Sequence, residues 1–409
     1  MRKATSQTMI TKASSAMVRL RNGQVVLDQF LEAGKQSIYR TQIARRTGLS
    51  KPTVNALVLN LEEAGLVKQV SSLQTHGRIG RPAASYELRP EAAMVVGVDM
   101  GVTKTLVGVA GLLGEVIAMD RIETPSHAVA AVDTVVTTVK RLLESLGGPV
   151  HRLEGACVGV PGVYRPSLDR VEMAPNLPGF VDLPILAELS ERLGVSVTIE
   201  NDVNLAAVGE AKAMASEGVT DFAAISIGTG IGMGIVMEGA LYRGAHGAAG
   251  EIGSVKLPRV GGEVSHGLTL EDVASAPAIR KLFHRSVEAG YRTNLEGDAD
   301  VPAIFGAAAH GDEAAASALN TVADAVALAV SYFCWTYDPA RVVFGGGVGD
   351  NPVFVDAVRA RIGHYLTVVP TLVPSKLGGQ AAFLGAVSNA LADVRSSLVV
   401  KRLGRRKEG

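Results

Sequence analysis

Residues 40–64, RTQIARRTGLSKPTVNALVLNLEEA, contain two helical patterns that a short glycine turn separates. The turn is Gly-Leu-Ser at 48–50, and Ser50 is a suitable N-cap for a helix over 51–64, because a serine hydroxyl accepts a hydrogen bond from the first helical turn. The apolar side chains that would face a core around this helix are Leu49, Val54, Leu57, Val58 and Leu61. Helix, glycine turn and helix together predict a helix-turn-helix.

An earlier helix and a basic hairpin extend this motif to a winged helix-turn-helix. Leu27, Phe30 and Leu31 give the earlier helix its apolar face, and residues 67–70 and 85–88 have the pattern of two strands. The loop between the strands contains GRIGRP at 77–82, whose arginines can lie in a narrow minor groove. The predicted DNA contacts are Arg40, Ser50, Lys51, Thr53, Asn55, Arg78 and Arg81. A winged helix that contacts only protein is the alternative.

The charge distribution favours the DNA-binding alternative. Residues 1–90 carry 14 Lys and Arg against five acidic residues, although the whole chain has no net charge. Phosphate contacts come from Lys and Arg, so nucleic acid would bind at the N-terminal domain rather than the acidic remainder. We expect a basic flexible leader over 1–21, the winged helix-turn-helix over 22–90 and a basic C-terminal tail over 396–409.

Length and composition describe a folded protein of two or three domains. The chain has 409 residues, of which 47% are hydrophobic and 20% charged, which leaves little room for long disordered segments. Cys157 and Cys334 lie in apolar stretches that favour buried thiols in a reducing cytoplasm. The apolar stretch 314–332 includes Asn320 and Asp324, so we interpret it as a core helix and not as a membrane span.

Residues 91–395 alternate between strand and helix patterns. Apolar runs at 95–99, 105–110 and 116–121 predict a three-stranded antiparallel start before a long helix near 132–146. A second strand-rich opening follows near 223. The fold class that this predicts is α/β, with two lobes and a cleft between them.

Three glycine-rich turns follow predicted strands in this body. They are GVDMGVTKT at 97–105, GTGIGMG at 228–234 and FGGGVG at 344–349. Any one of them alone is more often a tight turn, but three after strands favour a phosphate-binding ancestry. The candidate nucleotide-binding residues are Asp99, Gly101, Thr103, Gly228, Thr229, Gly230, Gly345 and Gly346.

Five motifs in the body resemble the ROK family of sugar kinases and repressors, which has the actin-like ATPase fold. They are VPGVY (160–164), APNLPGF (174–180), ENDVNLAA (200–207), GTGIGMGIV (228–236) and GAAGEIGS (247–254). The resemblance runs from residue 95 to about 392, and the winged helix-turn-helix that precedes it resembles the DNA-binding head of ROK regulators. It implies that Asp202 matches the general base of the kinases and that Asn176, Asn201 and Glu251 match sugar-binding positions. Capping or turn roles for these residues stay open.

The chain departs from the ROK pattern at two places. Ser254 replaces a zinc-binding histidine, and residues 257–275 contain no cysteine, so a zinc site with thiolate ligands is excluded there. His246 and His266 are then left as isolated imidazoles. Val102 replaces a glycine of the first phosphate turn, where its branched side chain would crowd a phosphate. We expect no resident metal or cofactor, and binding of ATP and Mg²⁺ stays open.

The sequence therefore predicts a cytoplasmic transcriptional regulator, associated with the bacterial nucleoid when it binds DNA. We expect a repressor of carbohydrate metabolism genes whose kinase-like body senses a sugar or sugar derivative. Its expected partners are operator DNA, the sugar effector and further copies of the chain in a homodimer or homotetramer, with no membrane partner. The alternative is an active, glucokinase-like ATP-dependent sugar kinase with an added DNA-binding head, which the retained Asp99, Thr103 and Asp202 support.

Overall fold

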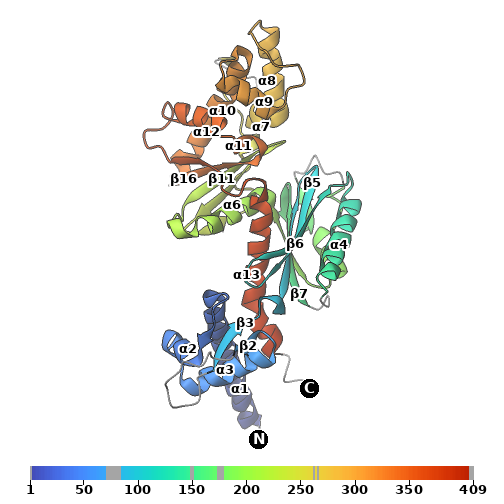
Figure 1. Cartoon of the computed structure of the whole chain (residues 1–409), viewed down its shortest axis with the longest axis vertical. Coiled ribbons are helices and arrows are strands. Elements are labelled where there is room, and N and C mark those ends of the chain that lie inside the picture. Colours follow the sequence, from blue (N-terminus) through green and yellow to red (C-terminus); the bar gives the residue numbers. More distant parts are fainter. Residues whose placement is uncertain are drawn as a thin grey trace.

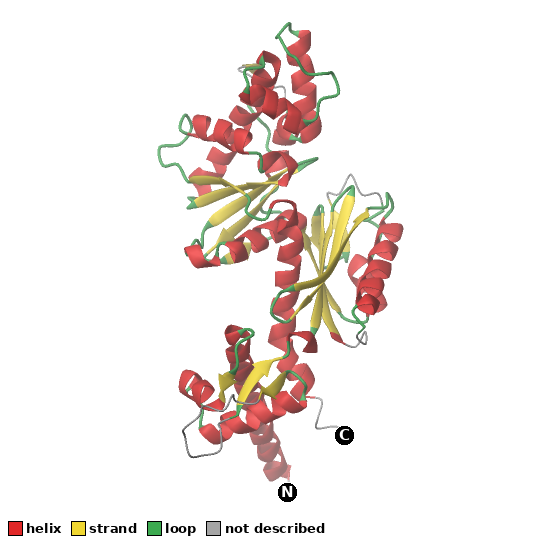
Figure 2. Ribbon diagram, viewed as in Figure 1, coloured by secondary structure: helices red, strands yellow, loops and turns green. Residues whose placement is uncertain are grey.

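The computed structural model describes residues 2–70, 84–147, 152–172, 179–260, 263–264 and 267–404, with the backbone alone for 2–15, 259–260 and 263–264. The molecule is elongated and has three parts (Figure 1). A head at the N-terminus is followed by lobe 1 and lobe 2 of an α/β body. Figure 2 shows that each lobe is a sheet between helices.

The head is a winged helix-turn-helix, as the sequence predicts. Its elements are α1 (Arg2–Ala33), β1 (Ile38–Tyr39), α2 (Arg40–Thr47), α3 (Lys51–Glu63), β2 (Val67–Val70) and β3 (Ser85–Leu88). The strands form an antiparallel sheet in the order β1-β3-β2. Ser50 caps α3, since its hydroxyl accepts a hydrogen bond from the Thr53 amide at 3.3 Å. The wing arginines Arg78 and Arg81 lie outside the described residues.

Two helices of the structure run across predicted domain boundaries. Residues 2–21 form the first part of α1, so they are not a separate leader. Residues 396–404 are the last turns of helix α13 (Ala381–Gly404), so the predicted tail is helical up to Gly404. The physical reason is that Leu398, Val399 and Leu403 are buried and give this basic segment an apolar face.

Lobe 1 contains a five-stranded mixed sheet in the order β10-β7-β4-β5-β6. Its strands are β4 (Met94–Met100), β5 (Lys104–Gly111), β6 (Val116–Glu123), β7 (Leu153–Val160) and β10 (Ser196–Asn201). Strands β4, β5 and β6 are antiparallel, which confirms the predicted start of the body. Helices α4 (Ala128–Ser145) and α5 (Ile185–Leu193) pack on one face and α13 on the other. A small hairpin of β8 (Val163–Arg165) and β9 (Arg170–Glu172) projects from β7.

Lobe 2 repeats this plan with the sheet order β13-β12-β11-β16-β17. The strands are β11 (Phe222–Ile227), β12 (Ile231–Met237), β13 (Ala240–Tyr242), β16 (Arg341–Gly345) and β17 (Thr371–Pro374). Helix α6 (Asp202–Ala213) packs on one face. The other face is covered by α7 (Leu270–Ala274), α8 (Ala276–Glu288), α9 (Val301–Ala309), α10 (Glu313–Tyr337) and α12 (Pro352–Ile362). Short elements β14 (Arg259–Val260), β15 (Glu263–Val264) and α11 (Gly346–Gly349) complete the lobe.

Two helices, α10 and α13, are long and apolar enough to span a membrane by length and composition. Both pack inside the folded chain instead. Helix α10 contributes buried residues from Ala314 to Cys334 to the core of lobe 2. This agrees with its interpretation as a core helix.

Helices α6 and α13 cross at backbone contact and join the lobes. A Cβ atom at Gly385 of α13 would lie 1.8 Å from the Leu205 carbonyl oxygen of α6. A Cβ atom at Gly209 of α6 would lie 2.3 Å from the Ala381 carbonyl oxygen of α13. Both distances are far below van der Waals contact, so the crossing requires glycine at both positions.

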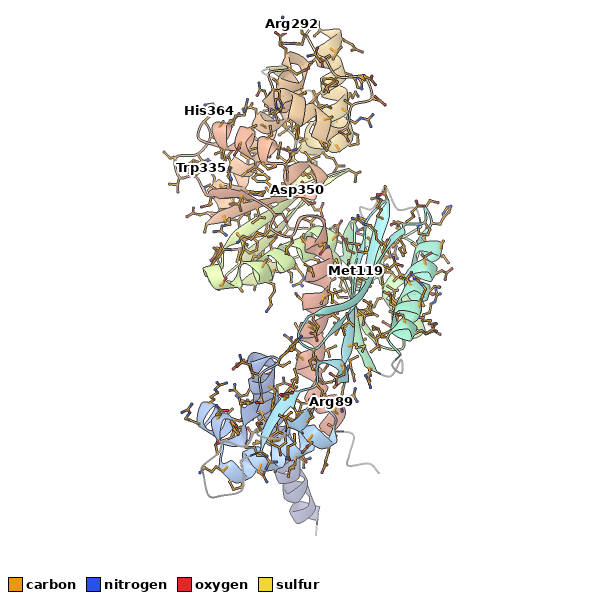
Figure 3. All side chains as sticks on the ribbon, in the orientation of Figure 1. Arg89, Met119, Arg292, Trp335, Asp350 and His364 are labelled. Carbon is orange, nitrogen blue, oxygen red and sulfur yellow. The ribbon has the colours of Figure 1, made fainter. Side chains whose placement is uncertain are left out.

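The far end of α13 packs against the head. Leu398, Val399 and Leu403 belong to the same hydrophobic cluster as Leu27 and Phe30 of α1. The cluster continues into lobe 1 through Val95, Ala110 and Leu112, and the Arg395 Nε atom donates to the Leu112 carbonyl at 3.1 Å. Arg89 marks the connector between head and lobe 1 (Figure 3). Head, α13 and one face of lobe 1 therefore share one core, which also takes in Leu205 of α6, whereas the rest of lobe 2 has separate cores.

We predict that Gly385→Ala lowers the free energy of unfolding by about 1–3 kcal/mol, because the added methyl group forces α6 and α13 apart. Urea unfolding followed by circular dichroism measures the change. Gly404→Ala is the matched control, since it lies in the same helix and a Cβ atom there has nothing within 4 Å. Equal stability of the two variants would contradict the crossing.

Candidate functional site

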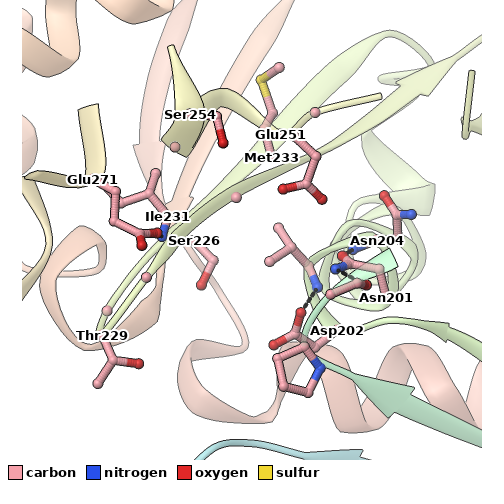
Figure 4. Close-up of a pocket in the computed structure, with 18 of the residues that line it drawn as sticks. Asn201, Asp202, Asn204, Ser226, Thr229, Ile231, Met233, Glu251, Ser254 and Glu271 are labelled. Atoms are coloured by element: carbon pink, nitrogen blue, oxygen red, sulfur yellow. Dashed lines mark hydrogen bonds between the residues drawn. The ribbon is translucent and has the colours of Figure 1, made fainter. Parts of the chain in front are cut away.

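A cavity of about 610 Å³ lies between the lobes at the start of α6 (Figure 4). Its lining comes from the β4–β5 turn, the end of β7, the β11–β12 turn and the loop before the short helix Ile252–Ser254. The predicted residues that it brings together are Gly101, Thr103, Asn201, Asp202, Gly228, Thr229, Gly230 and Glu251. Asp99, Gly345 and Gly346 line an adjoining cavity of about 210 Å³, which also reaches Asp202. Asn176 lies outside the described residues.

Asp202 and Asp99 are two half-buried carboxylates that repel each other. Burial raises the pKa of Asp202 to about 7, and the negative charges of Asp99 and Glu251 add to that rise. Burial also raises the pKa of Asp99 to about 6, although Arg121 opposes the shift. Asp202 begins α6, and its Oδ1 atom accepts a hydrogen bond from the Val203 amide at 2.9 Å. The site therefore holds a carboxyl that changes protonation near neutral pH.

Asn201 has a structural role in addition to its place in the cavity wall. Its Oδ1 atom caps α6 by accepting from the Asn204 amide at 2.9 Å, and its Nδ2 atom donates to the Gly162 carbonyl at 3.0 Å. These bonds fix the side chain between the two lobes. The capping role that the sequence left open is present, and a ligand contact stays a prediction.

Glu251 and Glu271 face each other across lobe 2's part of the cavity (Figure 4). Burial raises the pKa of Glu251, and the charge of Glu271 contributes. The Glu271 carboxylate accepts a hydrogen bond from the Ile231 amide at 2.9 Å. The sequence interpretation missed Glu271. A capping box formed by Thr269 and Asp272 around it marks a helix start, but that pattern does not reveal which tertiary cavity the helix borders.

The glycines of the GTGIGMG motif have two roles. Gly228, Gly230 and Gly232 border the cavity. A Cβ atom at Gly234 would lie 2.6 Å from the Ala207 Cβ atom, and one at Gly232 would lie 2.9 Å from Val203. The later glycines therefore let β12 pack directly against α6, which is a structural reason for part of a motif that the sequence interpretation assigned to phosphate binding.

The exposed surface of the helix-turn-helix carries three of the five predicted DNA contacts that lie among the described residues, and Arg40 and Thr53 are half-buried. Ser50, Lys51 and Asn55 are exposed. Arg45 and Arg46 at the end of α2 are exposed as well, and the sequence interpretation missed them. The sequence signal that could have identified them is a pair of adjacent cations shortly before the predicted helix 51–64.

Arg40 is engaged inside the head. Its guanidinium donates to the Asn55 side chain and to the Tyr86 hydroxyl, and it lies 4.6 Å from the centre of the Tyr86 ring. Arg40 thus joins α2, α3 and the wing strand β3. A DNA contact by Arg40 or Asn55 stays a prediction, but the structure gives both a role within the domain.

Residues 95–393 match the ROK family, and residues 20–71 match the IclR helix-turn-helix domain. The chain belongs to the ROK family. It is 27% identical to the xylose repressor of Caldicellulosiruptor bescii over 92% of this chain and 96% of that protein. It is 31% identical to the glucokinase of Thermotoga maritima over 72% of this chain and 96% of the enzyme. The fold resembles the crystal structure of a ROK family transcriptional regulator, a homologue of the E. coli Mlc protein, with a TM-score of 0.76 at 20% identity over 94% of this chain and 99% of that one.

The two departures from the ROK pattern both border the cavity. Val102 and Ser254 are among its lining residues. Within the described part of the chain, no three His, Cys, Asp or Glu side chains are arranged to hold a metal ion. His266 lies outside that part.

We predict that Asp202→Asn raises the free energy of unfolding of the ligand-free protein, and more at pH 8 than at pH 5. The pKa of Asp202 is higher in the folded protein than its ordinary value of 3.8, so folding favours the protonated form and stability falls as the pH rises from about 4 to about 7. At pH 8 the neutral amide avoids a half-buried charge, a gain on the order of 1 kcal/mol or more.

Urea titrations at both pH values measure this gain. Asp221→Asn is the contrast, because hydrogen bonds from Thr220 and the Glu238 amide lower the pKa of Asp221. That variant should lose stability at pH 8. A gain for Asp202→Asn that does not depend on pH would contradict the half-buried, proton-binding carboxyl.

Proposed function

We propose that the protein is a transcriptional repressor of the bacterial cytoplasm whose cleft binds a sugar and whose head binds operator DNA. The observation that carries this proposal is the single hydrophobic core that joins head, α13 and lobe 1 along one side of the cleft. Lobe 2 closes the cleft from the other side and has a separate core. A ligand that draws the lobes together would therefore move lobe 2 relative to a body that includes the head.

The cavity suits a ligand rich in hydroxyl groups. Its polar lining includes the carboxylates Asp202, Glu251 and Glu271 and the amide of Asn201. Carboxylate and amide oxygens accept hydrogen bonds from hydroxyls, and fixed acceptors on both lobes select their positions. Because similar proteins are named xylose repressor and glucokinase, we infer an uncharged pentose or hexose as the effector.

Two heads are needed for operator recognition. One recognition helix contacts few base pairs, and paired helix-turn-helix domains bind two half-sites at a fixed spacing. We propose a homodimer or a pair of dimers, in which closure of the cleft changes the spacing of the heads. Ser50, Lys51, Arg45 and Arg46 would meet DNA, together with the wing arginines that the sequence predicts.

The second candidate function is a sugar kinase with a DNA-binding head. Asp99 and Asp202 support it, because two adjacent half-buried carboxylates repel each other and a divalent cation such as Mg²⁺ would relieve that repulsion. Val102 counts against it, since its side chain borders the cavity at the turn where the ROK pattern has glycine. We propose that sensing, and not ATP-dependent turnover, is the function of this cleft.

We predict that Asp202→Asn binds operator DNA as tightly as the wild type in the absence of sugar, yet loses most of the response to sugar. The asparagine side chain can still accept the hydrogen bond from the Val203 amide, but it lacks the negative charge that the carboxylate offers to ligand hydroxyls. A thermal-shift panel of D-xylose, D-glucose and N-acetylglucosamine identifies the effector, since a ligand of the native state raises its stability. Operator titrations with and without that sugar measure the response.

The kinase alternative makes the opposite prediction in the same preparation. With ATP and Mg²⁺ present, we expect no sugar phosphate from the wild type. Sugar phosphorylation by the wild type that disappears in Asp202→Asn would establish the kinase and contradict the sensor.

A further inference from the structure

Two arginines form contacts between the lobes at the segment that leads to Glu251. Arg243 belongs to this segment, and Arg165 contacts it from lobe 1. This segment, residues 243–251, connects β13 to the short helix Ile252–Ser254 of lobe 2. At its start, the Arg243 Nε atom donates to the Glu200 Oε2 atom of β10 in lobe 1 at 2.6 Å. In its middle, the Arg165 guanidinium of β8 donates to the main-chain carbonyl of His246.

The lobe 1 ends of both contacts are themselves held in place. Glu200 is 8% exposed, and its Oε1 atom accepts from the Asn201 amide at 2.9 Å and from the Asn204 side chain at 3.0 Å. The Arg165 Nε atom also pairs with Glu172 at 2.9 Å. Glu200 lies two residues before Asp202, which begins α6 and borders the cavity.

The hairpin that carries Arg165 is tied to α5. Tyr164 donates to the Asp169 carboxylate at 3.0 Å. The same carboxylate accepts the Leu186 amide at 3.0 Å and the Ala187 amide at 3.1 Å. Arg165 is therefore presented from a fixed platform and not from a free loop.

The lobe 2 end of the segment is fixed at Gly250. Its carbonyl accepts the Met233 amide at 2.9 Å, and its φ of +92° is one that favours glycine. A Cβ atom there would lie 1.7 Å from the Met233 carbonyl oxygen, so the backbone touches β12 directly. Glu251 follows immediately, so residues 243–249 connect the two contacts with lobe 1 to this fixed point beside the cavity.

We propose that Arg165 and Arg243 are positioning residues that form a latch between the lobes and hold Glu251 opposite Asp202. The latch consists of two charge-assisted hydrogen bonds that cross from one lobe to the other. The proposal deepens the proposed function and rests on it only for the identity of the ligand as a sugar. Opening the cleft breaks both bonds, and a ligand that bridges Asp202 and Glu251 favours the closed state.

Hydrogen exchange of the ligand-free, full-length protein tests the latch directly. The amides of Ala249 and Ile252 bond within the segment, to the Arg243 and Gly250 carbonyls. We expect Arg165→Ala and Arg243→Gln each to speed their exchange by about tenfold, as the loss of one charge-assisted hydrogen bond implies. Unchanged exchange in both variants would overturn the proposal.

Two controls separate the latch from general loosening. In His246→Ala the acceptor of the Arg165 bond is retained, because that acceptor is the main-chain carbonyl, so exchange should match the wild type. Arg192→Ala breaks an ion pair with Asp133 that lies within lobe 1 at 2.6 Å, and it too should leave exchange at Ala249 and Ile252 unchanged. If exchange at these two amides is also faster in Arg192→Ala, the effect follows from losing any surface ion pair. That result would overturn the proposal.

Calorimetric titration with D-xylose and D-glucose tests the effect on the ligand. We expect both latch variants to bind the active sugar about tenfold more weakly, with the operator affinity of the sugar-free protein unchanged. Wild-type affinity for the sugar in both variants would overturn the positioning role. If the wild type binds neither sugar, the inferred sugar class is wrong, and the exchange result alone decides the latch.

Discussion

The backbone contact between α6 and α13 constrains the rest of the structure. Gly209 and Gly385 let the helices approach until a carbonyl oxygen of each occupies the place of a side chain on the other. Each helix covers the sheet of its own lobe, so the crossing is where the lobes meet. Asp202 begins one of these helices and the buried Leu403 ends the other, so cleft and head are linked by two rigid elements in contact.

The distribution of hydrophobic clusters determines which parts can move as units. One cluster runs from Phe30 in the head through Leu398 of α13 to Val95 in lobe 1. Another occupies lobe 2 between its sheet and α10. At the helix crossing Leu205 of α6 packs into the first cluster, and at the cleft polar contacts such as the Arg243 to Glu200 bond join the lobes. Apolar cores resist rearrangement more than single polar contacts do, so relative motion is expected between the lobes and not at the head.

Local sequence patterns predicted the elements whose signals are local. Ser50 marks the start of the recognition helix because its cap lies within three residues, and the wing strands follow from alternating patterns beside it. The sequence interpretation took the end of α13 for a tail. The reason is that the partners of Leu398 lie in α1, far away in the sequence. The same holds for the site. The family motifs predicted Asp202 and Glu251, whereas Glu271 enters the cavity only because a tertiary bond to Ile231 places it there.

Distances between the three parts, measured with and without saturating sugar, test whether the head moves together with lobe 1. Spin labels replace the exposed residues Lys35 in the head, Val129 in lobe 1 and Val368 in lobe 2, and both native cysteines, Cys157 and Cys334, are buried and unlabelled. We expect that sugar leaves the distance from head to lobe 1 unchanged and shifts both distances to lobe 2. A shift between head and lobe 1 while the two lobes keep their separation would contradict it.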